Sequence, residues 1–329
     1  MKISEKSKLE IAKKNILRNS FKPKDFVPIN GYNFNNGVNY DKLLDSFIST
    51  GFQATNLGKA FDIVKNMRKD KCTIFLGYTS NMVTSGLRDV FRYLAEHKLV
   101  DVIVTTAGGI EEDLIKCMDP FILGSFDADN EQLREKGINR TGNIFVPNDR
   151  YVKFEKFFIP FLEELNKQNK VFSVSEIIKL LGEKINHKDS IYYWAYKNNI
   201  PVFCPSFTDG SMGDMVYFFK YKHPEFKIDI ADDIKTLNDI AITSSKSGII
   251  VLGSGPIKHH ICNANMFRNG ADYAVYINNA QEFDGSDSGA RPEEAISWGK
   301  ILPEAKHVKV FGDATILFPL LVAKCFVDK

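Results

Sequence analysis

The sequence predicts a doubly wound α/β fold with helices on both faces of a mainly parallel sheet. Short apolar runs alternate with longer segments of helical periodicity. Several of the runs, such as 248–252, are almost entirely apolar, which is typical of strands buried on both faces. Glycine and polar residues follow most of the runs, as expected at the edge where open α/β sheets bind ligands. Together these observations indicate a Rossmann-like architecture.

The predicted strands cover residues 72–78, 100–106, 143–146, 201–207, 248–252, 271–277 and 308–311. Between them, the sequence predicts helices at about 57–70, 82–97, 151–168, 189–199, 229–245, 258–269 and 315–325. We expect residues 29–329 to form a single α/β domain that contains the ligand site.

Residues 1–28 are expected to form a separate basic arm. The first 24 residues carry eight basic side chains and two acidic ones. Leu9, Ala12 and Ile16 recur at spacings that predict a short amphipathic helix, and the arm is expected to end near Lys22-Pro23-Lys24. Partner docking and a solvated terminus both fit this pattern, whereas a mitochondrial presequence would be richer in arginine and poorer in acids.

The composition argues against several classes of protein. A net charge of +2 is too small for a dedicated nucleic-acid binder. No apolar run is long enough to span a bilayer and no signal peptide opens the chain, so we expect neither membrane insertion nor secretion. The five cysteines are scattered and never form Cys-x-x-Cys, which favours a reducing compartment, the cytoplasm, and no disulfide framework.

Polar residues follow six of the predicted strands, at 79–81, 105–113, 208–214, 253–255, 278–280 and 312–314. Because the carboxyl ends of parallel strands share one edge, these turns should form a common ligand site. Ser80 or Asn81 before a helix and the pair Gly108-Gly109 suit phosphate groups, which favours a nucleotide. The G-x-G-x-x-G fingerprint is not met, because Lys258 stands where its third glycine belongs, and no G-x-x-x-x-G-K-[ST] loop is present. A dinucleotide is therefore favoured over ATP only weakly.

The segment 281–300 is the most informative for chemistry. Its loop 281–294 carries five carboxylates and one arginine and is followed by Trp298 and Lys300. Most lysines are solvated, and an acidic loop is usually a simple turn. However, an indole that partly desolvates a lysine favours the neutral amine, which can attack an imine carbon. Clustered carboxylates would attract a polycation, so the segment predicts chemistry on an amine with Lys300 as the nucleophile.

Two adjacent histidines, His259 and His260, begin a predicted helix at the carboxyl end of a strand. Adjacent helical side chains point about 100° apart, so the two make a poor chelating pair, and no metal site is expected. A lone histidine is most often structural, but at this edge a general base is a fair alternative.

These residues resemble those of the deoxyhypusine synthase family. The similarity begins in 31–40, extends almost to the C-terminus, and is most specific at 75–81, 105–116, 208–215, 258–260 and 280–300. It implies an enzyme that uses NAD to oxidise spermidine to an imine, with release of 1,3-diaminopropane. The butylimine would pass to an enzyme lysine and then to one lysine of the initiation factor 5A precursor, where NADH would reduce it to deoxyhypusine.

By position, the resemblance implies that Lys300 forms the enzyme imine and that His259 is its acid/base partner. The substrate-binding residues it implies are Glu111, Glu112, Asp214, His259, Gly285, Ser286, Asp287, Glu294 and Trp298. The NAD-binding residues it implies are Ser80, Asn81, Thr84, Thr106, Ala107, Gly108, Glu112, Asp209, Asn279, Ala280, Asp313 and Ala314. At Thr84 and Asn279 the family usually has serine and threonine, which puts the affinity for NAD in question more than the chemistry.

The family resemblance also implies a homotetramer with active sites at a dimer interface, where the N-terminal helix covers a neighbouring entrance. Two alternative functions share the same residues. A homospermidine synthase would use putrescine as the acceptor. A non-catalytic regulatory subunit of a heteromeric enzyme would bind NAD and an active paralogue. Such a subunit would be expected to have lost the nucleophile, whereas Lys300, His259 and the acidic loop are all present here.

Overall fold

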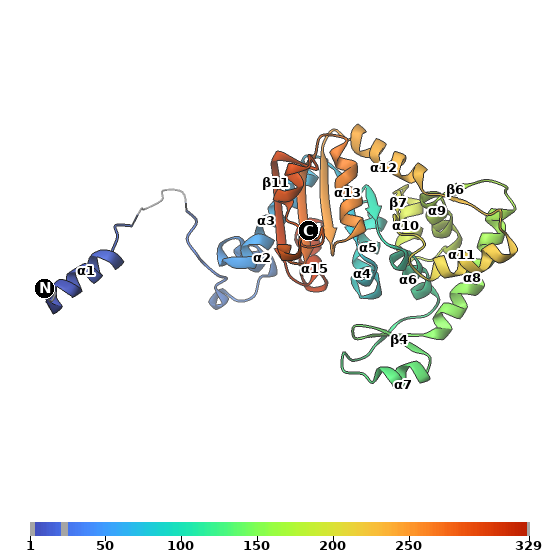
Figure 1. The fold of residues 1–329 in the computed structure, drawn as a ribbon, viewed down its shortest axis with the longest axis horizontal. Helices are drawn as coiled ribbons and strands as arrows, with labels where there is room; N and C mark the ends of the chain where they lie inside the picture. The colour runs from blue at the N-terminus through green and yellow to red at the C-terminus, as the bar shows by residue number, and fades with distance from the viewer. Residues whose placement is uncertain (1–3, 21–25, 328–329) are drawn as a thin grey trace.

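A six-stranded parallel sheet forms the centre of the computed structural model, which describes residues 4–20 and 26–327 (Figure 1). The strands are β1 (Thr73–Tyr78), β2 (Val102–Val104), β7 (Val202–Phe203), β9 (Ser247–Leu252), β10 (Ala271–Asn278) and β11 (Ile301–Phe311). Their spatial order is β11-β10-β9-β1-β2-β7, and every pairing is parallel. This is the doubly wound order of dinucleotide-binding folds, so the predicted fold class is confirmed.

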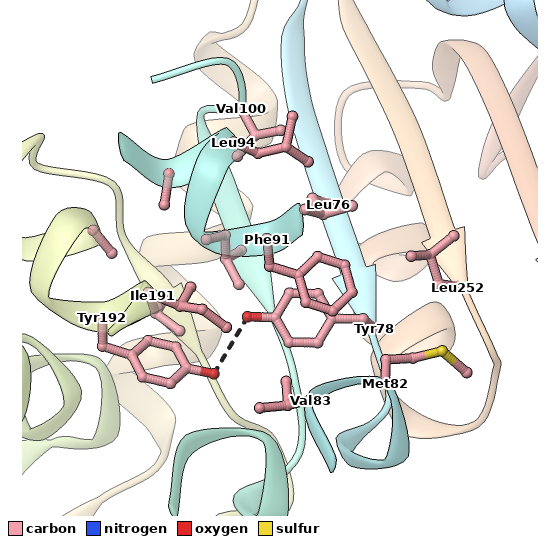
Figure 2. Packing of buried hydrophobic residues seen from close by; sticks show 14 of the residues in the cluster. Leu76, Tyr78, Met82, Val83, Phe91, Leu94, Val100, Ile191, Tyr192 and Leu252 are labelled. Atoms are coloured by element: carbon pink, nitrogen blue, oxygen red, sulfur yellow. Dashed lines mark hydrogen bonds between the residues drawn. The ribbon is translucent and has the colours of Figure 1, made fainter. Parts of the chain in front are cut away.

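Alternating strand residues face two separate hydrophobic clusters, because successive side chains of a strand point to opposite faces. Leu76 and Tyr78 belong to the cluster beneath helices that include α3 (Phe52–Lys69), α5 (Leu87–Glu96) and α15 (Ala314–Cys325). In that cluster the ring of Tyr78 stacks on Phe91, with centroids 4.0 Å apart (Figure 2). Burial on both faces explains why these strands are apolar along their length.

The opposite face of the sheet is covered by α12 (Ala231–Thr243), α13 (Pro256–Met266) and α14 (Pro292–Ser297). From α13, Ile257 and Ile261 pack beside strand residues such as Phe75 and Tyr276. Since these apolar side chains all lie on one face of α13, its other face remains available to a ligand.

Several elements differ from the prediction. The helix expected at 82–97 is divided into α4 (Ser80–Thr84) and α5, with Ser85 and Gly86 between them. Six of the described helices were not predicted, namely α2 (Tyr40–Thr50), α6 (Ala107–Met118), α7 (Asn130–Glu135), α9 (Val174–Ile185), α11 (Ser211–Lys222) and α14. The glycines and acids at the start of α6 and α11 resemble turn composition, which explains why these two were missed.

The predicted strand at 143–146 is β5 (Ile144–Pro147), which lies outside the central sheet. It pairs antiparallel with β3 (Ile122–Leu123) and β4 (Ile138–Thr141). With α7 (Asn130–Glu135), this small sheet projects from the body and is followed by α8 (Asn148–Asn166) (Figure 1). The remaining elements are α10 (Ile191–Lys197) and the short strands β6 (Phe172–Ser173) and β8 (Ile228–Asp229).

The predicted N-terminal helix is present as α1 (Glu5–Ile16), capped by the Ser4 hydroxyl, which accepts a hydrogen bond from the Ser7 amide. All its residues are exposed, and Figure 1 shows it well separated from the body. The predicted end of the arm at Lys22-Pro23-Lys24 lies outside the described residues. None of the described helices has the length and apolar character needed to cross a membrane.

Candidate functional site

The two central strands, β1 and β9, create a crevice at their carboxyl ends, because the chain leaves them toward opposite edges of the sheet. The Thr79 amide donates a hydrogen bond of 3.3 Å to the carbonyl oxygen of Leu252. Gly253 follows with φ +77°, and a Cβ atom there would lie 2.5 Å from Oγ1 of Thr79. Only glycine allows this close approach, so the turn after β9 rests against the turn after β1.

Predicted cofactor residues from α4 and α6 meet at this crevice. Oγ1 of Thr106 accepts a hydrogen bond of 3.1 Å from the Ser80 amide. A Cβ atom at Gly108 would lie 2.8 Å from Cβ of Ser80, so the glycine is needed for the two turns to touch. Asn81 accepts a hydrogen bond from the Thr79 hydroxyl, and Ala107 is buried beneath. A crevice with closely approaching backbones at this point of the sheet fits a dinucleotide.

Glu112 lies on α6 beside α4 and is half-buried. Burial raises its pKa to about 7, and the Thr84 hydroxyl, which donates to Oε2, partly opposes that rise. One turn later, Nζ of Lys116 donates to the carbonyl oxygens of Val83, Thr84 and Ser85 at 2.6, 2.6 and 3.0 Å. Lys116 thus caps α4, a role that was not predicted and whose only sequence signal is its spacing of four residues from Glu112.

An acidic cleft of about 720 Å³ lies beside this crevice. Its carboxylates come from Glu111, Glu155, Asp209 and Asp214, and Tyr151 is among its other lining residues. Of the described residues, no lysine, arginine or histidine lines the cleft. Such a surface favours a cation.

The Glu111 carboxylate also supports the start of α11. It accepts hydrogen bonds from the amides of Ser211 and Met212 at 3.1 and 2.8 Å. Burial raises the pKa of Glu111, while these two hydrogen bonds oppose the rise. Asp214 stands in the first turn of the same helix and is exposed to the cleft.

Lys300 lies between α14 and β11, with 9% of its surface exposed. Its Nζ atom lies 5.4 Å from the ring centroid of Trp298. Gly299, with φ +70°, ends α14 in a tight turn in which the Lys300 amide donates to the Ala295 carbonyl at 3.0 Å. Ala271, the first residue of β10, donates to the Lys300 carbonyl, so the Lys300 backbone lies at the amino end of the sheet.

A second lysine, Lys258, holds the acidic loop on α13. It is 2% exposed, and its Nζ donates to the carbonyl oxygens of Asp287 and Ala290. Burial lowers its pKa; the charges of Asp287 and Glu294 oppose this, and that of Lys300 adds to it. The sequence analysis did not predict this role for Lys258. The feature that could have indicated it is the position of a lysine on the apolar side of α13.

One carboxylate oxygen of Asp287 lacks a hydrogen-bond donor among the described residues. Its Oδ2 atom is buried, lies 4.0 Å from Nζ of Lys258, and accepts no hydrogen bond from any described residue. Three residues close to Asp287 in the sequence are exposed, namely Gly285, Ser286 and Glu294. The Ser286 amide donates a hydrogen bond to the carboxylate of Asp284. An ammonium group would satisfy the Asp287 oxygen.

His259 is on the exposed face of α13, and its Nδ1 lies 3.2 Å from the side-chain nitrogen of Asn263. The neighbouring His260 is half-buried, and burial, followed by the effect of His259, lowers its pKa. Among the described residues, no cluster of histidine, cysteine, aspartate or glutamate is arranged to hold a metal.

The remaining predicted cofactor residues follow β10 and β11 at the same edge as β1. The Ala280 amide donates to the side chain of Asn278, next to the exposed Asn279. Asp313 caps α15 by accepting from the Thr315 amide at 2.8 Å, and Ala314 is buried. All predicted nucleotide-binding turns therefore share the carboxyl edge of the sheet.

The structure divides the predicted residues into two groups. The edge group comprises Ser80, Asn81, Thr84, Thr106, Ala107, Gly108, Glu111, Glu112, Asp209 and Asp214. The lysine group comprises His259, Asp287, Glu294, Trp298 and Lys300, to which the structure adds Lys258. In the described part of the chain, no hydrogen bond, ion pair or ring contact joins one group to the other. The acidic cleft is not lined by any member of the lysine group.

Comparisons with known proteins agree on one family. A family model described as deoxyhypusine synthase matches residues 42–325. The deoxyhypusine synthase of Senecio vernalis is 53% identical over 92% of this chain and 90% of its own length. Homospermidine synthase 2 of the same plant is 50% identical over 99% of this chain and 96% of its own. A crystal structure of a candidate deoxyhypusine synthase from Entamoeba histolytica has a TM-score of 0.68 at 35% identity, covering 91% of this chain and 96% of that one.

Proposed function

Because this chain belongs to the deoxyhypusine synthase family of NAD-dependent transferases, we propose that Lys300 is its nucleophile. The reaction would transfer the 4-aminobutyl group of spermidine to one lysine of the initiation factor 5A precursor. The observation that carries the assignment is the nearly buried Lys300 ammonium against Trp298, next to an acidic loop.

Spermidine carries several ammonium groups, and carboxylates of both groups suit them. Oδ2 of Asp287 lacks a hydrogen-bond donor, Glu294 is exposed on α14, and Asp214 lines the acidic cleft. The exposed indole of Trp298 would pack on the aliphatic part of the substrate. Gly285, Ser286, Glu111 and Glu112 would complete the substrate-binding surface.

The NAD-binding residues would be Ser80, Asn81, Thr84, Thr106, Ala107, Gly108, Glu112, Asp209, Asn279, Ala280, Asp313 and Ala314. The close approaches at Gly253 and Gly108 support this assignment, since a side chain at either position would fill the crevice. When bound, NAD supplies the hydride acceptor for the amine carbon and returns the hydride at the end of the reaction.

The protein groups would handle the protons and the carbon–nitrogen bonds. His259 would take the proton that the secondary amine releases on oxidation. The neutral amine of Lys300 would then add to the imine carbon, and the bond from that carbon to 1,3-diaminopropane would break as the leaving amine is protonated. The acceptor lysine would repeat this exchange and release Lys300.

A second copy of the chain would complete the site, because the edge group and the lysine group do not contact each other within one chain. Trp298 is 64% exposed and the acidic cleft is open, so both surfaces are available to a neighbour. The family resemblance adds a homotetramer in which α1, with its exposed Leu9 and Ile16, covers a neighbouring entrance. Coexpression of Lys300→Ala with Asp214→Ala tests this proposal. If each site takes Lys300 from one chain and Asp214 from the other, a mixed dimer has one intact site and activity is recovered. If both residues of a site come from the same chain, no activity is expected.

Intact-mass spectrometry tests the nucleophile directly. The pure chain would be mixed with NAD and spermidine and then treated with borohydride, which reduces an imine to a stable amine. We expect one butylamine-sized adduct on Lys300, retained in the control Lys306→Ala and absent from Lys300→Ala. No adduct on the wild-type chain, with NAD and spermidine bound, would contradict the assignment and favour a regulatory subunit.

Homospermidine synthesis is the second candidate, since a relative with that activity is 50% identical to this chain. The same nucleophile, NAD and spermidine sites would serve it. Product analysis with putrescine as the sole acceptor distinguishes the two, because homospermidine would form only in the second case.

A further inference from the structure

We propose that Asn263 is a positioning residue for His259. Its side-chain amide would hold the imidazole ring by Nδ1, so that Nε2 is the nitrogen that exchanges a proton with the amine substrate. This inference rests on the acid/base role proposed above for His259.

The geometry comes from one face of α13. His259 and Asn263 are four residues apart, one turn of the helix, and Nδ1 of the ring lies 3.2 Å from the amide nitrogen of Asn263. Ile257 and Ile261 anchor the opposite face of the helix in the core beneath the sheet. Among the described residues, the His259 side chain has no other hydrogen-bond partner, so the orientation of its exposed ring depends on Asn263.

The chemistry requires a particular arrangement of protons. A neutral imidazole accepts a proton at Nε2 only if its own proton is on Nδ1. Half a turn of the Asn263 amide about its Cβ–Cγ bond brings the oxygen to Nδ1, where it accepts that proton in a hydrogen bond. The protonated ring keeps the same hydrogen bond, so one amide orientation serves His259 both before and after it takes a proton.

An uncharged amide suits this task better than a carboxylate. A carboxylate at Nδ1 would stabilise the imidazolium relative to the neutral ring, which makes the ring a weaker proton acceptor. The charged and titratable groups around this turn of α13 are Lys258, His260, Asp287, Glu294 and Lys300. They are unchanged in variants at position 263, so a comparison among such variants isolates the effect of the amide.

Nuclear magnetic resonance of histidine-labelled full-length protein, without NAD or spermidine, tests the contact. The His259 signals are assigned by their loss in His259→Gln. We expect the Nδ1–H tautomer in the wild type and in Asn263→Asp, and a shift toward Nε2–H in Asn263→Leu.

Kinetics provide a second readout. Asn263→Leu should lower kcat about tenfold or more while leaving the KM for spermidine within about twofold, because the ring is misoriented but the carboxylates remain. Asn263→Asp should regain activity only at higher pH. Met266→Leu, exposed on the same helix, is the control, and thermal melting verifies that each variant is folded.

An Nε2–H tautomer in the wild type would overturn the proposal, as would an Asn263→Leu variant with the wild-type tautomer and kcat. If His259→Gln itself keeps wild-type kcat, the acid/base assignment of His259 fails instead. The tautomer measurement separates the two failures, because it does not depend on turnover.

Discussion

The hydroxyl group of Tyr192 donates a hydrogen bond of 2.8 Å to the carbonyl oxygen of Gly109, which joins α10 to the first turn of α6. The same hydroxyl lies 3.3 Å from that of Tyr78 (Figure 2). Both tyrosines are buried, and α6 carries Glu111 and Glu112. A buried polar contact therefore supports the helix on which two predicted site residues stand.

Tyr192→Phe should lower the free energy of unfolding by about 1–2 kcal/mol, because the contacts of a buried hydroxyl are lost. Urea denaturation measures the change. Tyr93→Phe is the matched control, since the Tyr93 hydroxyl has no hydrogen-bond partner among the described residues. Equal stability of the Tyr192 variant and the wild type would show that the contact contributes nothing.

Lys300→Ala should abolish transfer to the protein acceptor while leaving the binding of NAD and spermidine largely intact, because the nucleophile is lost but the carboxylates remain. Lys300→Arg should fail as well, since a guanidinium stays protonated and cannot form an imine. Binding measured by calorimetry and transfer measured by acceptor mass separate the two effects. Wild-type transfer by either variant would refute the assignment.

Asp287→Asn should raise the KM for spermidine roughly tenfold to a hundredfold, because a hydrogen bond to a charged group contributes about 1.5–3 kcal/mol. Its Oδ2 atom is the buried oxygen that still lacks a donor. Steady-state kinetics with varied spermidine measure the effect. Glu293→Gln, exposed on α14, should leave the KM close to that of the wild type.

The stability of the protein should depend on the protonation of Glu112. Burial raises its pKa from 4.5 to about 7, so between these values the folded state binds more protons than the unfolded state. The free energy of unfolding therefore falls as the pH rises through this window, and Glu112→Gln should remove that fall.

Relative to the wild type, Glu112→Gln should gain on the order of 1–3 kcal/mol between pH 4.5 and pH 8. Denaturation curves at several pH values measure it, and Glu135→Gln, exposed on α7, is the control. A constant difference between Glu112→Gln and the wild type across this range would contradict the assigned pKa.

The apolar strands could be predicted because their composition alone shows burial on both faces. β9, predicted at 248–252, is found at Ser247–Leu252, and α13, predicted at 258–269, is found at Pro256–Met266. By contrast, the first turn of α6 contains Gly108 and Gly109, which signal a turn in sequence but allow close packing against Ser80 and Thr105 in the structure. Whether such glycines form a turn or a closely packed helix depends on which segment lies opposite them.

The roles of Lys116 and Lys258 could not be predicted for the same reason. Lys116 binds carbonyl oxygens about thirty positions earlier in the chain, and Lys258 binds carbonyl oxygens about thirty positions later. Every residue has a backbone carbonyl oxygen, so the residue types do not indicate which carbonyl accepts a hydrogen bond. Such contacts become visible only when the helices are placed side by side.

The sequence by itself determined the fold class and the edge of the sheet that carries the polar turns. It also predicts amine chemistry at Lys300. These follow from the periodicity, local composition and spacing of residues close in the chain. Only the tertiary structure decided that the backbone of Lys300 lies at the opposite end of the sheet from those turns. It also decided that Lys300 does not line the acidic cleft. The reason is physical. The spatial separation of segments that are far apart in the sequence depends on how strands pair and helices pack, and local sequence patterns do not specify either.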